Sequence, residues 1–137
     1  MKTFIFLLAF FFSISCRAQS GMYLPSINPV LNCVVYSVDS AHFIRVDDQV
    51  YVYGKFQIRN SDSLSQVILK ISTPYALRYN VKNPSAGNCF IFGSGFSPIV
   101  GSCLSSFADG GKIQLYYVSP VLNIVVVDYF FIYSVKN

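Results

Sequence analysis

Alternating positions over residues 50–59 form the clearest pattern in the chain. One set is Val50, Val52, Gly54, Phe56 and Ile58, and the other is Tyr51, Tyr53, Lys55, Gln57 and Arg59. Successive side chains of a β-strand point to opposite faces, so this pattern predicts a strand with one buried face. Residues 43–46 form a second β-prone run. Asp tolerates the positive φ of tight turns, so residues 47–49 predict a hairpin between the two runs.

Further strands are predicted downstream, each bounded by turn-forming residues. Residues 60–63 are turn formers, and residues 67–72 alternate again until Thr73-Pro74 ends the strand. Residues 75–88 lack periodicity and predict a loop that crosses between two sheets, with a short helical turn at 75–79 as an option. Strands with glycines are predicted at 89–96 and 99–104, followed by a hairpin turn at 108–111 and a strand at 113–118.

The last run, residues 124–135, is apolar on both faces. This predicts a strand in the middle of a sheet or at a subunit contact, which Phe131 or Tyr133 would form. No window combines helical spacing with a capping signal. Short strands separated by turns indicate an all-β fold, an antiparallel sandwich or barrel. No repeat, low-complexity tract or linker interrupts residues 19–137, which we expect to form one domain.

Residues 1–18 have the three-part layout of a secretory signal peptide: basic Lys2, an apolar run at 4–12, and small or polar residues at 13–18. The run is shorter than the roughly 20 residues of a transmembrane helix. We therefore expect no membrane span in the mature chain. Cleavage after Ala18 is the favoured outcome, and lipidation of Cys16 is the alternative. The expected location is secreted or in the cell envelope, with a virion as a further option.

Cleavage after Ala18 leaves three cysteines, an odd number for an oxidising compartment. Cys89 and Cys103 flank a turn-rich stretch that can place them on neighbouring strands, so a disulfide between them is predicted. The alternative is that all three, with Cys33, are small buried hydrophobic residues. A zinc site would need a fourth ligand and CxxC spacing, and the sequence has neither.

Composition excludes several classes of function. Of 137 residues, 53% are hydrophobic and 12% are charged, which is too apolar for a disordered chain. Loss of Lys2 and Arg17 with the signal peptide lowers the formal charge from +4 to +2, so nucleic-acid binding loses its main electrostatic argument. The chain has no Glu and one His, so acid–base catalysis has few groups to use. We expect no enzyme, cofactor or metal. The alternative is a hydrolase that uses Asp39, Asp62 or Asp128 as carboxylates.

Tyrosines supply the candidate binding groups. Tyr51 and Tyr53 lie on the predicted outward face beside Lys55 and Arg59, and later strands add Tyr116, Tyr117, Tyr129 and Tyr133. An exposed tyrosine can stack on a sugar ring or form a protein contact. The alternative is that these rings only cover a sheet, because strands favour aromatic residues. The candidate binding residues are Tyr51, Tyr53, Lys55, Arg59 and Tyr116.

Other polar features have simpler explanations. His42 lacks a second His or a Glu beside it and is more typical of a strand end than of a metal ligand. Asp47 and Asp48 are adjacent and are explained by turn capping rather than by calcium binding. Residues 93–95 (GSG) lack the Lys-Ser/Thr and the helix of a phosphate loop.

Six short segments occur in a fixed order along the mature chain. They are residues 21–25 (GMYLP), 42–46 (HFIRV), 50–56 (VYVYGKF), 71–74 (ISTP), 87–95 and 113–117. In this order and spacing they resemble the compact β-sandwich domain that often ends phage tail-fibre and related virion proteins, and that also occurs in short secreted proteins. Asp47-Asp48 departs from the Gly-Asn that is usual in this family.

The resemblance implies an antiparallel, jelly-roll-like β-sandwich over residues 19–137. It also implies a non-enzymatic, secreted or virion-associated module that binds a receptor at a surface, either a cell-surface glycan or a protein. The alternative is a structural envelope subunit that forms homo-oligomers, or a lipoprotein anchored at Cys16.

Overall fold

The computed structural model describes residues 18–76, 86–105 and 112–135. These residues form ten strands and no helix. The strands are β1 (Ala18–Tyr23), β2 (Ile27–Leu31), β3 (Cys33–Val38), β4 (Ala41–Val46), β5 (Gln49–Asn60), β6 (Gln66–Ile71), β7 (Ala86–Phe92), β8 (Ile99–Ser105), β9 (Ile113–Val118) and β10 (Ile124–Ser134). The all-β class predicted from the sequence is confirmed.

All ten strands belong to one antiparallel sheet. Nine of them follow the order β1-β4-β5-β10-β7-β8-β9-β6-β2, and β3 pairs with β5 outside this path. The predicted β4–β5 hairpin is present, with Asp47 in its turn at a φ of 52°. The long strand β10 lies between β5 and β7, which confirms the prediction of a central strand.

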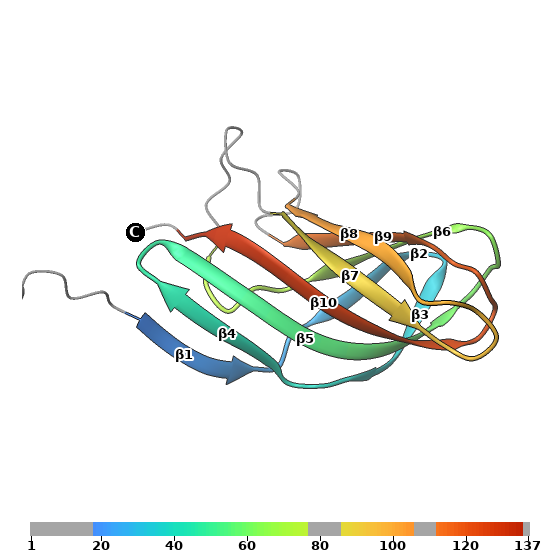
Figure 1. The fold of residues 1–137 in the computed structure, drawn as a ribbon, viewed down its shortest axis with the longest axis horizontal. Helices are drawn as coiled ribbons and strands as arrows, with labels where there is room; N and C mark the ends of the chain where they lie inside the picture. The colour runs from blue at the N-terminus through green and yellow to red at the C-terminus, as the bar shows by residue number, and fades with distance from the viewer. Residues whose placement is uncertain (1–17, 77–85, 106–111, 136–137) are drawn as a thin grey trace, which may run out of the picture.

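The sheet curls, so that strands far apart in its order meet across one core. The Tyr117 hydroxyl on β9 donates a hydrogen bond to Asn60 Oδ1 on β5. At another place the Tyr23 hydroxyl on β1 donates to the carbonyl oxygen of Ser72, next to β6, at 3.0 Å. Figure 1 shows the ribbon bending over so that β6 and β2 lie behind the layer that contains β4, β5 and β10.

Alternate residues of each long strand fill the core. In β5 the side chains of Val50, Val52, Phe56 and Ile58 are fully buried, as the alternation predicted. In β10 the buried set is Val125, Val127, Tyr129, Phe131 and Tyr133. Removing this apolar surface from water stabilises the fold by roughly 25 cal/mol per Å².

The long strand β5 exchanges neighbours along one of its edges. Its first half pairs with β4, as His42 opposite Tyr53 illustrates, and its second half pairs with β3, with Val38 opposite Phe56. Between the two, the Asp39 amide donates to the Lys55 carbonyl oxygen at 3.2 Å. The short β3–β4 connection therefore lies opposite the middle of β5, and this junction shapes the candidate site.

The sequence pattern did not predict β1, β2 and β3, and the predicted start of β7 is too late. β7 begins at Ala86 rather than at residue 89, so the predicted loop of 75–88 overlaps it. The predicted hairpin turn at 108–111, the lipidation site Cys16 and the signal peptide up to residue 17 lie outside the described residues. No helix in the described part of the chain is long and apolar enough to cross a membrane.

Candidate binding site

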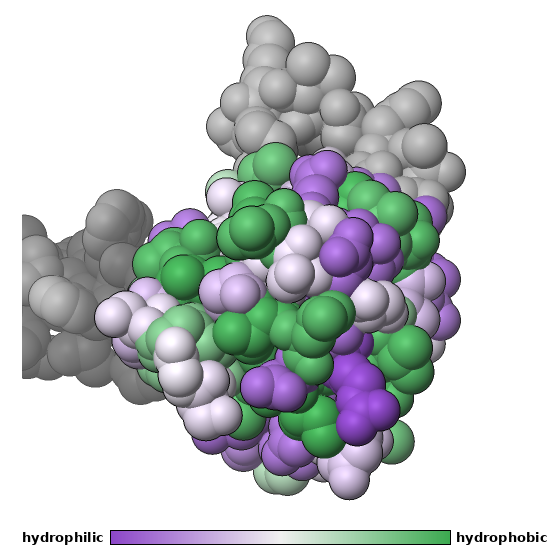
Figure 2. Space-filling view, turned by 90° about the vertical axis from the view of Figure 1, so that its right-hand side faces the viewer, coloured by the Kyte–Doolittle hydropathy of each residue, from purple (hydrophilic) through white to green (hydrophobic). Residues whose placement is uncertain are grey.

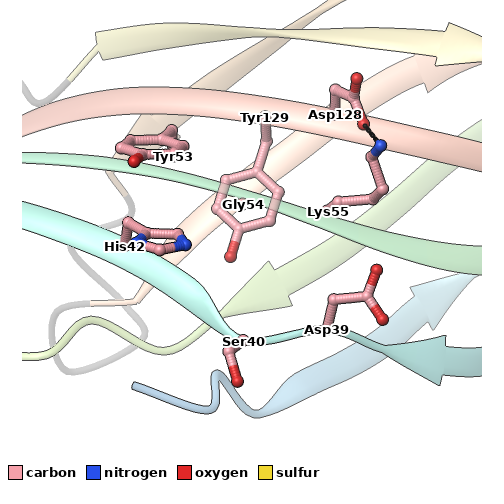
Figure 3. Close-up of a pocket in the computed structure, with 8 residues that line it drawn as sticks. All are labelled: Asp39, Ser40, His42, Tyr53, Gly54, Lys55, Asp128 and Tyr129. Carbon is pink, nitrogen blue, oxygen red and sulfur yellow. Dashed lines mark ion pairs between the residues drawn. The ribbon is translucent and has the colours of Figure 1, made fainter. Parts of the chain in front are cut away.

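A hollow of about 400 Å³ opens beside the middle of β5. The β3–β4 connection contributes Asp39 and Ser40, β4 contributes His42, and the remaining lining residues are Tyr53, Gly54, Lys55, Asp128 and Tyr129 from β5 and β10 (Figure 3). Three separate segments thus supply its side chains. We refer to it as the Gly54 hollow.

Gly54 leaves room in the sheet for the ring of Tyr129. A Cβ at position 54 would lie 2.6 Å from Tyr129 Cζ and 2.9 Å from the Cβ of Ala41. Because glycine leaves this space open, the ring of Tyr129 crosses β5, and its hydroxyl end is directed toward the β3–β4 connection (Figure 3). Tyr53 and Lys55 flank Gly54 and have exposed side chains.

One wall of the hollow is aromatic. His42 and Tyr53 are opposite each other on β4 and β5, and their rings stack with centroids 5.0 Å apart and an angle of 5° between planes. Tyr53 keeps 49% of its surface exposed. A flat ring with a hydroxyl at its edge offers both apolar area and a hydrogen-bonding group to a ligand.

The opposite side of the hollow is charged. Lys55 and Asp128 are opposite each other on β5 and β10, and Lys55 Nζ lies 3.7 Å from Asp128 Oδ1. Both side chains are about half exposed, so the pair contributes at most about 1 kcal/mol to stability. Asp39 adds a second carboxylate to the lining. Acceptor groups therefore predominate around one ammonium group.

Two polar atoms beside this hollow are buried. Asp128 Oδ1 has no hydrogen bond among the described residues, but it lies 3.7 Å from Lys55 Nζ. Tyr129 Oη lies beside the Tyr23 hydroxyl, with which it shares a side-chain hydrogen bond, and the Tyr23 hydroxyl donates to the Ser72 carbonyl oxygen at 3.0 Å. Burial raises the pKa of Tyr129, so its hydroxyl keeps its proton at neutral pH. Because both atoms are buried, this hollow offers a ligand the exposed side chains of Asp39, Tyr53 and Lys55 and the half-exposed side chain of Asp128.

A second hollow of about 280 Å³ adjoins the first. It is lined by Ser20, Gly21, Met22, His42, Phe43, Ile44 and Tyr53. His42 and Tyr53 belong to both hollows. We refer to this one as the β1 hollow, because β1 forms its outer side.

The five candidate binding residues do not form one site. Tyr53 and Lys55 lie in the Gly54 hollow, and Tyr51, 37% exposed, is opposite Ile44 at the edge of the β1 hollow. Arg59 is exposed near the far end of β5, the end of the molecule seen in Figure 2, where hydrophobic and hydrophilic residues are mixed in small groups. Tyr116 is half-buried on β9 and donates a hydrogen bond to Gln114.

The tyrosines on the later strands were expected to be exposed, and for three of them this is wrong. Tyr117, Tyr129 and Tyr133 are 4%, 2% and 2% exposed. The pairing with β5 explains this for β10, because Tyr129 is opposite Gly54 and shares its inward face. These rings belong to the core.

The three cysteines are buried free thiols in the structure. Cys89 and Cys103 lie on the neighbouring strands β7 and β8 in diagonal positions, since Cys89 is opposite Gly101 and Cys103 is opposite Gly87. A hydrogen bond with Cys89, together with burial, raises the pKa of the Cys103 thiol. The disulfide between them stays a prediction.

The sequence pattern did not predict Asp39, His42 and Asp128 as ligand-binding residues. It pointed to His42 only as a metal ligand and to the two Asp residues only as carboxylates of a hydrolase. Asp39 and Asp128 do line the same hollow, whereas Asp62 accepts a hydrogen bond from Ser65 at 2.7 Å elsewhere. The sequence contains one signal for this site. Gly54 interrupts a strand face that otherwise consists of Val, Phe and Ile side chains.

No group of three or more His, Cys or Asp side chains that could hold a metal ion occurs among residues 18–76, 86–105 and 112–135.

Comparisons with protein-family models, with curated proteins and with solved structures found no match for this chain. The resemblance to phage tail-fibre domains therefore stays a prediction, and the two hollows are the features of the structure that bear on function.

Proposed function

We propose that the mature chain is a non-enzymatic, secreted or virion-associated binding module that recognises a glycan on a cell surface. In this proposal residues 19–137 form a jelly-roll-like β-sandwich, and the ligand binds at the Gly54 hollow. The observation that supports it best is the combination of the stacked His42 and Tyr53 rings with the carboxylates of Asp39 and Asp128 and the Lys55 ammonium group around one hollow. The predicted signal peptide and the resemblance to tail-fibre domains are consistent with it.

The chemistry of the hollow suits a sugar. The apolar face of a pyranose ring can lie on Tyr53, while its hydroxyl groups donate to the carboxylates of Asp39 and Asp128 and accept from Lys55. Few other small ligands present one apolar face and a ring of hydroxyl groups together.

A glycan array tests the proposal, with protein purified after expression of the full chain. Tyr53→Ala and Asp128→Asn should each weaken binding at least tenfold. Tyr36→Ala is the matched control, because Tyr36 is an exposed tyrosine on β3 outside both hollows. A protein that binds no glycan, or that loses binding equally in the control, would contradict the proposal. If bound glycans were shortened, and Asp39→Asn or Asp128→Asn stopped the shortening, the hydrolase alternative would replace it.

A second candidate is the structural envelope subunit that forms oligomers. It is favoured by exposed apolar side chains on neighbouring outward positions, where Phe90 on β7 is opposite both Asp128 and Val100. Phe90, Val100 and Phe130 are 44%, 64% and 43% exposed. The residues expected to form this contact, Phe131 and Tyr133, are buried, so substituting them would affect folding first.

Light scattering on size-fractionated protein tests this second candidate. An oligomer that dissociates on Phe130→Ser and Phe90→Ser, with unchanged thermal stability, would support it. A monomer in the wild-type protein would exclude it. A lipid-bearing N-terminal peptide beginning at Cys16, detected by mass spectrometry, would identify the lipoprotein form of this alternative.

A further inference from the structure

The two hollows are on opposite sides of the same aromatic pair. From the His42–Tyr53 stack the Gly54 hollow extends toward Lys55, Asp39 and Asp128, and the β1 hollow extends toward Met22 and Ile44. The register places these residues in two neighbouring rows: Met22, His42 and Tyr53 are opposite one another on β1, β4 and β5, and Lys55, two residues after Tyr53, is opposite Asp128 on β10. A ligand that follows them crosses β10, β5, β4 and β1.

The linings of the hollows differ in polarity. The Gly54 hollow presents the carboxylates of Asp39 and Asp128 and the Lys55 ammonium group. The β1 hollow is lined by Met22, which is 62% exposed, by Ile44, which is 45% exposed, and by the small residues Ser20 and Gly21. The first suits a sugar unit held by hydrogen bonds, and the second suits the apolar face of another unit.

The charges of the Gly54 hollow disfavour acidic ligands. Two carboxylates, Asp39 and Asp128, stand against one ammonium group, and Lys55 is already paired with Asp128. The carboxylates of Asp39 and Asp128 accept hydrogen bonds from a hydroxyl or an ammonium group, whereas an ionised carboxylate has no proton to donate to them. Like charges at close range repel, so a sialic or uronic acid unit would bind weakly here.

We propose that the glycan is a chain of at least two neutral or amino-bearing sugar units that crosses the His42–Tyr53 stack and places one unit in each hollow. This inference rests on the proposed glycan-binding function and adds the ligand's minimum length and its charge class.

The probes are immobilised sugar series of one to six units: neutral chitin-type and cellulose-type chains, amino-bearing chitosan, acidic polygalacturonate, and sialylated chains. Wild-type protein should bind two or more units of a non-acidic series at least tenfold more tightly than one unit. Acidic chains of equal length should bind at least fivefold more weakly. Tight binding of single units, or equal binding of acidic chains, would overturn the inference while leaving the proposed function intact. Absence of binding to every series would overturn both.

Single-residue variants test the contribution of each hollow to binding separately. Met22→Ala should weaken binding of chains of two or more units about threefold and leave single units unchanged, because Met22 belongs to the β1 hollow alone. Leu24→Ala is the control, since Leu24 is 71% exposed and outside both hollows. Asp39→Lys should shift the preference toward acidic chains. An unchanged preference in this variant, or an effect of Met22→Ala on single units equal to that on longer chains, would contradict the assignment.

Discussion

The ring of Tyr129 occupies the space that a side chain at position 54 would need. The two residues are opposite each other on β10 and β5, and a Cβ on Gly54 would lie 2.6 Å from Tyr129 Cζ. This contact lets an aromatic ring cross a strand and reach the β3–β4 connection. It also makes the candidate site depend on a single glycine.

Gly54→Ala should therefore lower the free energy of unfolding by about 1–3 kcal/mol, because an added methyl group must displace the Tyr129 ring or Ala41. Urea denaturation measures this change. Gln57→Ala, on the outward face of the same strand, is the control and should change the stability by less than about 0.5 kcal/mol. If the two variants proved equally stable, the close contact between Gly54 and Tyr129 would be wrong.

Stability should fall at alkaline pH, because buried tyrosines resist ionisation. Burial raises the pKa of Tyr133 from 10.0 to about 12, and burial also raises the pKa values of Tyr23, Tyr117 and Tyr129. Between pH 10 and pH 12 the unfolded chain loses the Tyr133 proton while the folded protein keeps it. The stability that the protonated group provides is complete below pH 10 and disappears as the pH rises toward 12.

Urea denaturation from pH 8 to pH 11.5 measures this effect. Each such tyrosine steepens the decline by up to about 1.4 kcal/mol per pH unit. Tyr133→Phe should make the decline above pH 10 shallower than in the wild-type protein. Burial also raises the pKa of Cys33 to about 11, and because both proteins contain Cys33, the difference between their curves is due to Tyr133 alone. Parallel curves for the two proteins would show that Tyr133 is exposed to solvent.

Asn60 joins the two sides of the curled sheet. It is 2% exposed, it accepts a hydrogen bond from the Tyr117 hydroxyl, and it donates to the Val121 carbonyl oxygen at 3.0 Å. Asn60→Ala leaves both partners unsatisfied in the core and should lower the free energy of unfolding by about 1–3 kcal/mol. Tyr117→Phe removes only the donor and should cost less.

A double-mutant cycle on Asn60 and Tyr117 checks that the two effects have one origin. The expected coupling energy is at least about 0.5 kcal/mol, because the side chains share a hydrogen bond. Strictly additive losses of stability would mean that the two residues do not meet across the core.

Cys89 and Cys103 should form a disulfide when the protein is purified from an oxidising compartment or treated with oxidised glutathione. The two thiols lose two protons and two electrons, and one oxidised glutathione accepts them and becomes two reduced molecules. Peptide mapping without reductant should show residues from β7 and β8 linked, with a mass lower by two hydrogens, and Cys33 as the free thiol. Three free thiols after oxidation would instead support the alternative of three buried hydrophobic residues.

The sequence predicted best the elements whose two faces differ in polarity. In β5 the alternation of apolar and polar residues alone identified the strand and its buried face. Four residues of the apolar set, among them Val50 and Phe56, are fully buried. In β10 both faces are apolar, and the pattern could not decide whether Tyr129 or Phe130 faces the core. The register with Gly54 decides it, and register between distant strands is not visible in one sequence.

The strands β1 and β2 were not predicted, and each has a local reason. β1 is a mostly polar edge strand, and β2 contains Pro29 and an irregular register beside it. Of the eight residues that line the Gly54 hollow, the sequence predicted Tyr53 and Lys55 as binding residues. Asp39 and Asp128 could not be placed beside them, because a strand exchange on one edge of β5 and a pairing with β10 bring these carboxylates together.

The most direct measurement is an NMR titration of ¹⁵N-labelled protein with a neutral oligosaccharide of two or more units. We expect the largest chemical-shift changes at the backbone amides of His42 and Tyr53, which line both hollows, and of Gly54, which lines the first. Changes concentrated around Tyr116 on β9 or Arg59 at the end of β5, or no saturable change, would contradict binding at the Gly54 hollow.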